Sequence, residues 1–429
     1  MRHEARPSAV ATSAGESTGR PLWEQADFLK LWTAQTISVF GDHFSGLAIP
    51  LIAVLTLGAT PGQMGILTAV TRAPFLLSGL FAGVWVDRLP RRPVLITGDL
   101  GRAVVLLSIP LAAILGTLSM LHLYAVGVLV GIFTVFFDVA YQAYLPALVH
   151  RGQLVEGNSK LEATRSLAGL AGPSIAGVVI QLVSAPLAIV LDAISFVASG
   201  GLISLIRRRE SSTEQSVRGP VLVEVREGLS VVLGNPLLRS IAGCTGTSNF
   251  FGSALFALFI LFATRELQLG PAQIGVIFSI GGVTGLIGAL TAGWVAKRLG
   301  VGRTIVGASL LTGLATVPVA AASPGTAWLL ILSTMLGSFS NPIYNINQVS
   351  LRQAITPHRL QGRMNATMRF LVWGTMPLGG LLGGVLGASL GLRAAIAVAA
   401  AGGLLAFPWV ALSPVRTLRA IPDPHRIMA

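Results

Sequence analysis

Several ionisable side chains stand inside long apolar stretches of the sequence, and three of them are candidates for proton coupling: Asp42, Arg72 and Asp138. A charge in apolar surroundings is costly, so such residues are rare unless they serve a relay, a pathway or a pairing. A carboxyl group in this setting can take up and release a proton, and a guanidinium group can balance its charge. These residue types therefore predict a proton-binding site within the apolar part of the protein.

The spacing of two of these residues predicts that they meet. Asp42 stands roughly 14 residues into its apolar stretch, and Arg72 stands roughly 15 residues before Asp87 in the next, oppositely directed one. At about 1.5 Å per helical residue, both lie roughly 21 to 23 Å from the same end. We therefore expect an Asp42 and Arg72 pair in which protonation of Asp42 releases Arg72. The alternative is a permanent structural ion pair.

The second half of the chain supplies neutral groups instead. Between residues 240 and 412 the only acid is Glu266, which falls in a loop. A titrating carboxyl must therefore come from the first half, with Asp42 the first candidate and Asp138 the second. Amide and aromatic groups suit a bulky, amphipathic ligand, although each also suits plain helix packing. The candidates for a substrate cavity are Asn249, Phe250, Phe251, Tyr344, Asn345, Gln348 and Trp373.

The elements that carry these residues are predicted to be membrane-spanning helices. Hydrophobic residues make up 53% of the chain and charged residues 11%, with a mean hydropathy of +0.75. Stretches of roughly 20 continuously apolar residues match a helix that crosses a bilayer, and barrel strands would alternate instead. We predict an all-α membrane protein whose twelve spans lie near 28–57, 64–87, 93–117, 121–147, 163–183, 187–206, 240–263, 271–296, 304–322, 326–350, 365–390 and 392–412.

The basic residues predict the orientation of these spans. If the N-terminus is cytoplasmic, all but six of the 30 Lys and Arg lie in or beside cytoplasmic segments, as the positive-inside rule requires. Both termini are then cytoplasmic. The net charge of +13 is explained by an anionic inner leaflet and needs no nucleic acid. No phosphate-cradling loop, nucleophile elbow or zinc signature is present, so we expect no enzyme, no cofactor and no metal, with a proton gradient as the energy source.

Internal repetition divides the chain into two halves. The second span ends in GVWVDR and the eighth in GWVAKR, while the fourth contains DVAY where the tenth contains NPIY. Such repeats are typical of transporters built from two related halves. We predict a disordered cytoplasmic tail over 1–27, six-helix halves over 28–206 and 240–412, and a cytoplasmic C-terminal tail over 413–429. The linker over 207–239 holds either a helix on the membrane surface or an ordinary soluble connector.

The turn after the second span carries a family resemblance. Over residues 28 to 412 the chain resembles the major facilitator superfamily, with Pro90 where the family signature usually has Gly. The resemblance implies a cytoplasmic gate that latches the halves together when a transporter opens outward. Asp87 is then expected to face the positive N-terminus of the eleventh helix. The alternative is that the arginines of this turn serve only to hold it at the cytoplasmic surface, as the positive-inside rule describes. The signature residues are Gly83, Asp87, Arg88, Arg91 and Arg92.

The same resemblance extends to neighbouring elements. The arginines of the gate are expected to bridge to Asp99 and Asp138. In the fifth span, Gly172, Pro173 and Gly177 of GPSIAG resemble the family's antiporter motif, in which the helix bends between the halves; a simple proline kink is the alternative. FGDHFSGLAIPL, FFDVAYQAYLPALV and LDAISFVAS resemble the branch that holds macrolide efflux proteins and the enterobactin exporter.

Together these features predict a secondary active transporter that exports amphipathic small molecules, drugs or antibiotics, by proton antiport and alternating access. Export of an endogenous siderophore, lipid or secondary metabolite is the alternative within the same architecture. A transport-inactive receptor or regulator is the alternative of another class, and absence of any flux would support it. The expected partners are a small-molecule substrate, protons and the lipid bilayer of a bacterial cytoplasmic membrane, with a monomer as the working unit.

Overall fold

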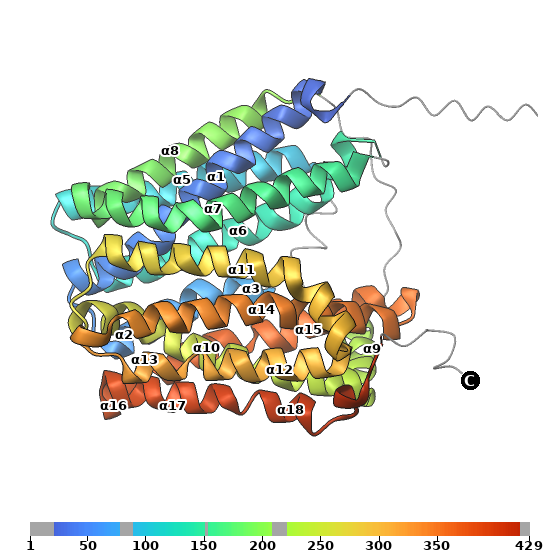
Figure 1. Ribbon diagram of the computed structural model, residues 1–429. Helices are drawn as coiled ribbons and strands as arrows, with labels where there is room; N and C mark the ends of the chain where they lie inside the picture. The colour runs from blue at the N-terminus through green and yellow to red at the C-terminus, as the bar shows by residue number, and fades with distance from the viewer. Residues whose placement is uncertain (1–20, 78–88, 151–152, 208–220, 421–429) are drawn as a thin grey trace, which may run out of the picture.

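The computed structural model describes residues 21–77, 89–150, 153–207 and 221–420, and these residues form helices and connecting turns without any strand. Two helical bundles lie side by side (Figure 1). The first contains α1 (Ala26–Leu51), which continues as a π-helix over Ile52–Thr56, α2 (Pro61–Arg72), α3 (Pro74–Leu77), α5 (Arg91–Ile114), α6 (Met120–Leu148), α7 (Leu154–Val183) and α8 (Ala185–Ser204). The predicted all-helical fold is confirmed.

The second bundle follows a connecting helix, α9 (Val221–Gly234). It contains α10 (Pro236–Arg265), α11 (Pro271–Leu299), α12 (Val301–Leu314), α13 (Val317–Ala321), α14 (Trp328–Ile355), α15 (His358–Trp373), α16 (Thr375–Leu390), α17 (Leu392–Leu404) and α18 (Phe407–Ala411). We refer to the two bundles as the N-terminal and C-terminal halves.

Ten helical segments of the described chain are long and apolar enough to cross a membrane. Two of the twelve predicted spans are not among them, for different reasons. The second span begins as α2 and α3, and its remainder lies within 78–88, outside the described residues. The tenth is α14, which has 28 residues but carries polar Asn341, Asn345 and Gln348. A span with such a polar face suits a position that lines a cavity and not one that faces lipid.

Helix boundaries follow local sequence signals. α2 begins after Thr60, whose hydroxyl accepts from the backbone N–H of Gln63 while the Gln63 side chain accepts from the Thr60 N–H. This capping box satisfies two amide groups that would otherwise lack partners. α10 begins after Asn235, whose side-chain oxygen accepts from the backbone N–H groups of Leu237 and Leu238. In the twelfth predicted span, α17 stops before Pro408, because proline cannot continue a helix.

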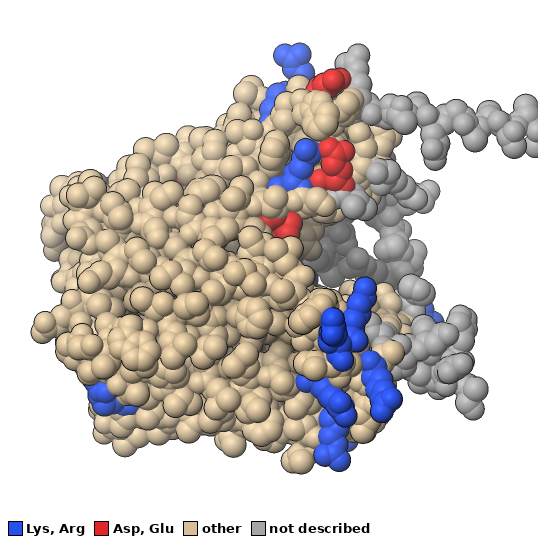
Figure 2. All heavy atoms as spheres, viewed as in Figure 1, with Lys and Arg blue, Asp and Glu red and all other residues tan. Residues whose placement is uncertain are grey.

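The bundle has two distinct ends. We call the end at which α1 begins and α18 ends the terminal face, and the other end the opposite face. Figure 2 shows Lys and Arg side chains gathered at the terminal face over the C-terminal half, with Asp and Glu beside them on the N-terminal half. A smaller basic group lies at the opposite face. This uneven distribution agrees with the count made from the sequence.

The two halves pack together along two seams lined by glycine. In the first seam α2 lies against α16, where a Cβ atom on Gly65 would stand 2.6 Å from the Gly384 Cα and 2.7 Å from the Gly380 oxygen. In the second seam α7 lies against α11, where a Cβ on Gly177 would stand 2.5 Å from the Pro271 oxygen. Only glycine permits backbones to approach this closely.

Both seams include the ends of helices at the opposite face, because α2 and α11 begin there and α7 and α16 end there. Polar contacts between the halves reinforce them. Arg265 donates to the Ala59 carbonyl at 2.9 Å, and the Ala272 N–H donates to Gln181 at 3.2 Å. The halves are therefore closed against each other at the opposite face.

Widening one seam is expected to open the opposite face. Gly275→Val places side-chain atoms against the carbonyl of Pro173 in α7, and backbone cannot give way cheaply. We expect faster labelling of Ser279→Cys by a membrane-impermeant maleimide in a Cys244→Ser background, because Ser279 bonds Ser174 across this seam. Gly307→Val, where a Cβ meets nothing within 4 Å, is the matched control. Equal labelling rates in both variants would refute the role of this seam.

The connector α9 packs on the C-terminal half. Gly228 lies against the backbone of Arg363 and the side chain of Thr367 in α15, and Glu227 forms an ion pair with Arg363. α9 also contacts the start of α10. The helix within the predicted linker is therefore attached to its neighbours by packing as well as by charge.

Candidate functional site

The C-terminal half holds a cavity of about 640 Å³ with a mostly polar wall. This volume lies within the range of small-molecule sites. Five of the seven candidates from the sequence line it: Asn249, Tyr344, Asn345, Gln348 and Trp373. They come from α10, α14 and α15. Hydroxyl and amide groups from Thr245, Ser248, Ser309, Thr312, Asn341, Gln353 and Asn365 add to the same wall.

Phe250 and Phe251, the other two candidates, do not line this cavity. The residues of α10 that do so, Cys244, Thr245, Ser248 and Asn249, share one helix face. Phe251 points instead toward α17, where a Cβ on Gly402 would meet its ring, and the backbone of Phe250 lies against α16. The two rings pack edge to face with centroids 5.1 Å apart. Adjacent residues on a helix point in different directions, and three neighbours cannot share one wall.

A second pocket of about 260 Å³ adjoins the first, because both are lined by Ser248, Asn249, Thr312, Asn341 and Met376. Its other wall comes from α2 of the N-terminal half, which contributes Thr68 and Arg72. The side chain of Arg72 is exposed to this space.

The predicted pair of Asp42 and Arg72 is not formed. None of the ion pairs among the described residues joins them, and Asp42 interacts electrostatically with Arg102 and Arg165 instead. Equal depth along two helices does not make two residues neighbours, because the side chains also have to lie on facing sides. Arg72 faces the pocket of the other half.

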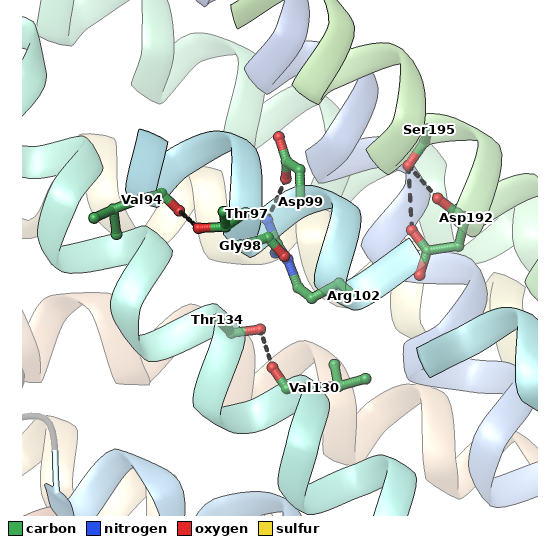
Figure 3. Close-up of polar contacts among 9 residues, drawn as sticks. All are labelled: Val94, Thr97, Gly98, Asp99, Arg102, Val130, Thr134, Asp192 and Ser195. Atoms are coloured by element: carbon green, nitrogen blue, oxygen red, sulfur yellow. Dashed lines mark hydrogen bonds and ion pairs between the residues drawn. The ribbon is translucent and has the colours of Figure 1, made fainter. Parts of the chain in front are cut away.

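A buried ion pair lies within the N-terminal half (Figure 3). In α5, Arg102 Nη2 stands 2.5 Å from Asp99 Oδ1, and both side chains are almost completely buried. The guanidinium carbon lies 4.5 Å from the centroid of the Phe137 ring and 4.0 Å from that of Phe196. Two aromatic faces thus stabilise the cation that balances Asp99. The second oxygen of Asp99 is buried without a hydrogen-bond partner.

Asp192 on α8 is a second buried carboxyl group in the same half. It is 1% exposed, and its Oδ1 accepts from the Ser195 hydroxyl at 3.2 Å, as Figure 3 shows. Its Oδ2 has no partner. α1 passes close by because residue 41 is glycine: a Cβ there would stand 2.6 Å from Asp192 Oδ1. The small residue therefore brings α1, and Asp42 with it, against this carboxyl group.

Asp42 is the accessible member of this group. Its side chain is exposed although it lies within α1, and it interacts electrostatically with Asp99, Asp138 and Asp192. Asp138 on α6 in turn interacts with Arg165 and with Arg369, and Arg369 lines the cavity of the C-terminal half. A continuous set of charges therefore runs from the buried acids of one half to the cavity wall of the other.

The structure describes two of the five predicted gate residues, Arg91 and Arg92. Gly83, Asp87 and Arg88 lie outside the described residues. Arg92 donates to the carbonyls of Ile203 and Ser204 at the end of α8, where exposed helix carbonyls attract a cation. Arg91 opens α5 beside it.

The expected bridge from the gate arginines to Asp99 does not agree with the structure. Asp99 is fully buried and is paired with Arg102 of its own helix. It lies two turns further along α5 than Arg91 and Arg92, and the pair with Arg102 occupies one of its oxygens. Spacing of three residues along a helix is enough to bring Asp99 and Arg102 together.

The antiporter-motif residues lie where the halves meet. Gly177 and the carbonyl of Pro173 contact α11, and the backbone N–H of Ser174 donates to Ser279 of α11 at 3.0 Å. Gly172 faces α1, where a Cβ would overlap the ring of His43. Small residues in this stretch thus permit close packing on two neighbours.

Sequence reasoning missed several of these residues, although two signals for them were present. Asp99 and Arg102 stand three residues apart inside an apolar span, which places them on one helix face. The polar residues Thr245, Ser248, Asn249 and Ser253 recur at helical spacing in α10. Arg369 stands within a predicted span, but a single basic residue there does not indicate a cavity. Arg352 gave no signal, because basic residues near a cytoplasmic end are expected anyway.

The chain resembles characterised transport proteins over most of its length. A family of transmembrane secretion effectors matches residues 17–424. The multidrug efflux pump Tap of Mycolicibacterium fortuitum is 28% identical over 359 residues, which cover 80% of this chain and 84% of that protein. The enterobactin exporter EntS of Salmonella typhimurium is 25% identical over 348 residues, 79% of this chain and 80% of that protein.

Solved structures show the same fold. A bacterial homologue of the iron transporter ferroportin, in its inward-facing state, has a TM-score of 0.71 at 17% identity and covers 90% of this chain and 98% of its own. Its outward-facing state has a TM-score of 0.60 over the same shares. The nucleoside transporter NupG has a TM-score of 0.71 at 13% identity and covers 90% and 99% of the two chains.

Proposed function

This chain belongs to the transmembrane secretion effector family of the major facilitator superfamily, and from this membership we propose that it exports amphipathic small molecules by proton antiport. It is a membrane transporter and not an enzyme. In our proposal the terminal face lies in the cytoplasm, and the cavity opens toward it while the glycine seams close the opposite face. Tap, a multidrug efflux pump, and EntS, an enterobactin exporter, are relatives that support the outward direction.

One observation carries the coupling to protons. Asp42 is exposed, and its electrostatic contacts lead through Asp138 to Arg369 in the cavity wall. Three carboxyl groups, those of Asp42, Asp99 and Asp192, all interact with Arg102, the one fully buried cation in the described part of the chain, and Asp42 also interacts with Arg165. Excess negative charge in apolar surroundings is costly, and binding a proton relieves it. We propose that Asp42 exchanges this proton with the cavity, with Asp138 as the second candidate.

Alternating access then follows from the two seams. Substrate would first enter the cavity from the cytoplasm, and the proton would be released. α2 would then separate from α16, and α7 from α11. The gate residues Asp87, Arg88 and Arg91 would hold the cytoplasmic side closed in the other state. A monomer suffices for this cycle, because the cavity lies within one chain.

The test is export by the wild-type chain in a bacterial host that lacks its main efflux pumps. We expect lower accumulation of at least one compound in a panel of macrolides, lipophilic cations and organic anions, relative to the empty vector. A protonophore should abolish the difference. Export that persists in the protonophore would exclude proton coupling. No effect on the whole panel would favour a narrow endogenous substrate, such as a siderophore, and no flux of any compound would favour a receptor.

A further inference from the structure

Three arginines line the two adjoining pockets. Arg352 on α14 and Arg369 on α15 line the larger pocket, and Arg72 on α2 lines the smaller one. None of the ion pairs among the described residues includes any of them. Guanidinium groups keep their charge in proteins, so three positive charges point into this space.

The described residues that line the two pockets include no Asp or Glu. This follows from the composition of the C-terminal half, whose only acid between residues 240 and 412 is Glu266. Glu266 caps the end of α10 at the opposite face and contacts Arg393 there. The described carboxyl group that interacts with Arg369 is that of Asp138, which belongs to the other half. Within the described part of the chain, the positive charge in the pockets is thus not balanced locally.

Arg72 is the deepest of the three. α2 begins at the opposite face with Pro61, so Arg72 lies about 16 Å along the helix from that end. A long basic side chain near a membrane surface normally extends to the headgroups. Arg72 instead ends in a pocket whose neighbours include the neutral side chains of Asn249, Asn341 and Ser253. A guanidinium group held this way is poised to bind an anion by charge-assisted hydrogen bonds.

The other two arginines point to the same ligand chemistry. The Nε of Arg352 is buried and has no hydrogen-bond partner. Arg369 lies over the ring of Trp373 at 5.6 Å and interacts electrostatically with Arg352. Like charges repel more strongly where water is scarce. An anionic group in the cavity would relieve this repulsion and supply the missing acceptor.

We propose that the cavity binds an amphipathic organic anion, whose carboxylate or similar group is held by Arg72 while its apolar body lies against Trp373 and Met376. This inference rests on the proposed export function and names its substrate class. Arg369 and Arg352 would receive the anionic group nearer the terminal face, before it reaches Arg72. A cationic amphiphile of the same size would be disfavoured by all three charges.

The test compares two probes that differ only in charge: dansylglycine, a carboxylate, and its neutral methyl ester. Binding is measured by energy transfer from tryptophan to dansyl on purified protein in phosphatidylcholine nanodiscs, without a proton gradient. We expect wild type to bind the carboxylate more tightly than the ester. Arg72→Gln should weaken binding of the carboxylate about tenfold to a hundredfold, because that is the contribution of one charged hydrogen bond to affinity. The affinity for the ester should not change. Arg72→Lys should retain most of the preference.

Arg303→Gln is the matched control, because Arg303 is exposed at the start of α12 and lines neither pocket. Unchanged ester binding shows that each variant is folded. Equal affinity for the two probes in wild type, an unchanged preference in Arg72→Gln, or no saturable binding of dansylglycine would each overturn the proposal. None of these outcomes affects the export assay in cells. The proposed substrate class can therefore be refuted while the proposed export function stands.

A lipid headgroup is the other source of an anion. The ratio of dansylglycine affinities between wild type and Arg72→Gln should be the same when phosphatidylglycerol is added to the nanodiscs, since surface charge affects both proteins equally. A ratio that falls to one would assign the arginines to lipid and overturn the substrate site.

Discussion

Asp42→Asn is expected to reduce proton-driven export to the level of cells that lack the protein. The asparagine has the shape of a protonated aspartic acid but cannot release a proton. The C-terminal half offers no replacement, since Glu266 is its only acid, and Asp99 and Asp192 are buried. We expect exchange of an exported compound across vesicle membranes without a gradient to continue, because the cavity wall is unchanged. Accumulation in pump-deficient cells and exchange in vesicles, at equal protein levels, measure the two activities.

The matched control for this prediction is Glu156→Gln, which removes an exposed carboxyl group at the terminal face that pairs with Lys160 of the same helix. It should export as wild type does. Full gradient-driven export by Asp42→Asn would clear Asp42 of the coupling role, and Asp138→Asn would then be the variant to measure. Loss of both export and exchange would mean that Asp42 shapes the cavity and does not carry the proton.

Arg102→Met is expected to be the most destabilising single substitution in the N-terminal half. Methionine keeps much of the apolar stem but leaves Asp99 as a buried carboxyl group without its cation. Removing one partner of a buried pair costs about 3 to 5 kcal/mol. The two contacts with Phe137 and Phe196 are lost as well. Reversible unfolding of the purified protein in mixed micelles measures the change in the free energy of unfolding.

Arg298→Met separates this effect from loss of an arginine in general. Arg298 also lies over an aromatic ring, that of Trp294, but it is exposed, and such contacts contribute only about 0.5 to 1 kcal/mol. The double variant Asp99→Asn with Arg102→Met should recover part of the lost stability, because the stranded charge is gone. A cost for Arg102→Met no larger than that for Arg298→Met would refute the structural role of the pair.

Candidate cavity residues could be predicted where polar or aromatic side chains interrupt an apolar span. Asn249, Tyr344, Asn345, Gln348 and Trp373 were identified because polar and aromatic groups stand out in apolar spans, and all five line the cavity. Phe250 and Phe251 of the same set lie away from this cavity, because the aromatic residues were selected by type and not by helix face.

Contacts between helices were less predictable, as Arg72 illustrates. The depth of Arg72 in the membrane was derived from spacing alone. Its neighbours could not be derived in this way, because rotation of α2 about its axis decides whether Arg72 faces α1 or the C-terminal half. The close contact of Gly65 with Gly380 and Gly384 fixes that rotation. This contact joins residues more than 300 positions apart in the sequence.

The sequence by itself determined the class of fold, the number of predicted spans, the twofold repetition and the scarcity of acids in the second half, because each of these depends on composition and on periodicity along one helix. The tertiary structure alone decided which charges meet: Asp99 with Arg102 between two rings, Asp192 against α1, and Arg72 in the pocket of the other half. Apolar periodicity determines where a helix crosses the membrane, whereas close packing of small residues determines how helices are rotated and paired.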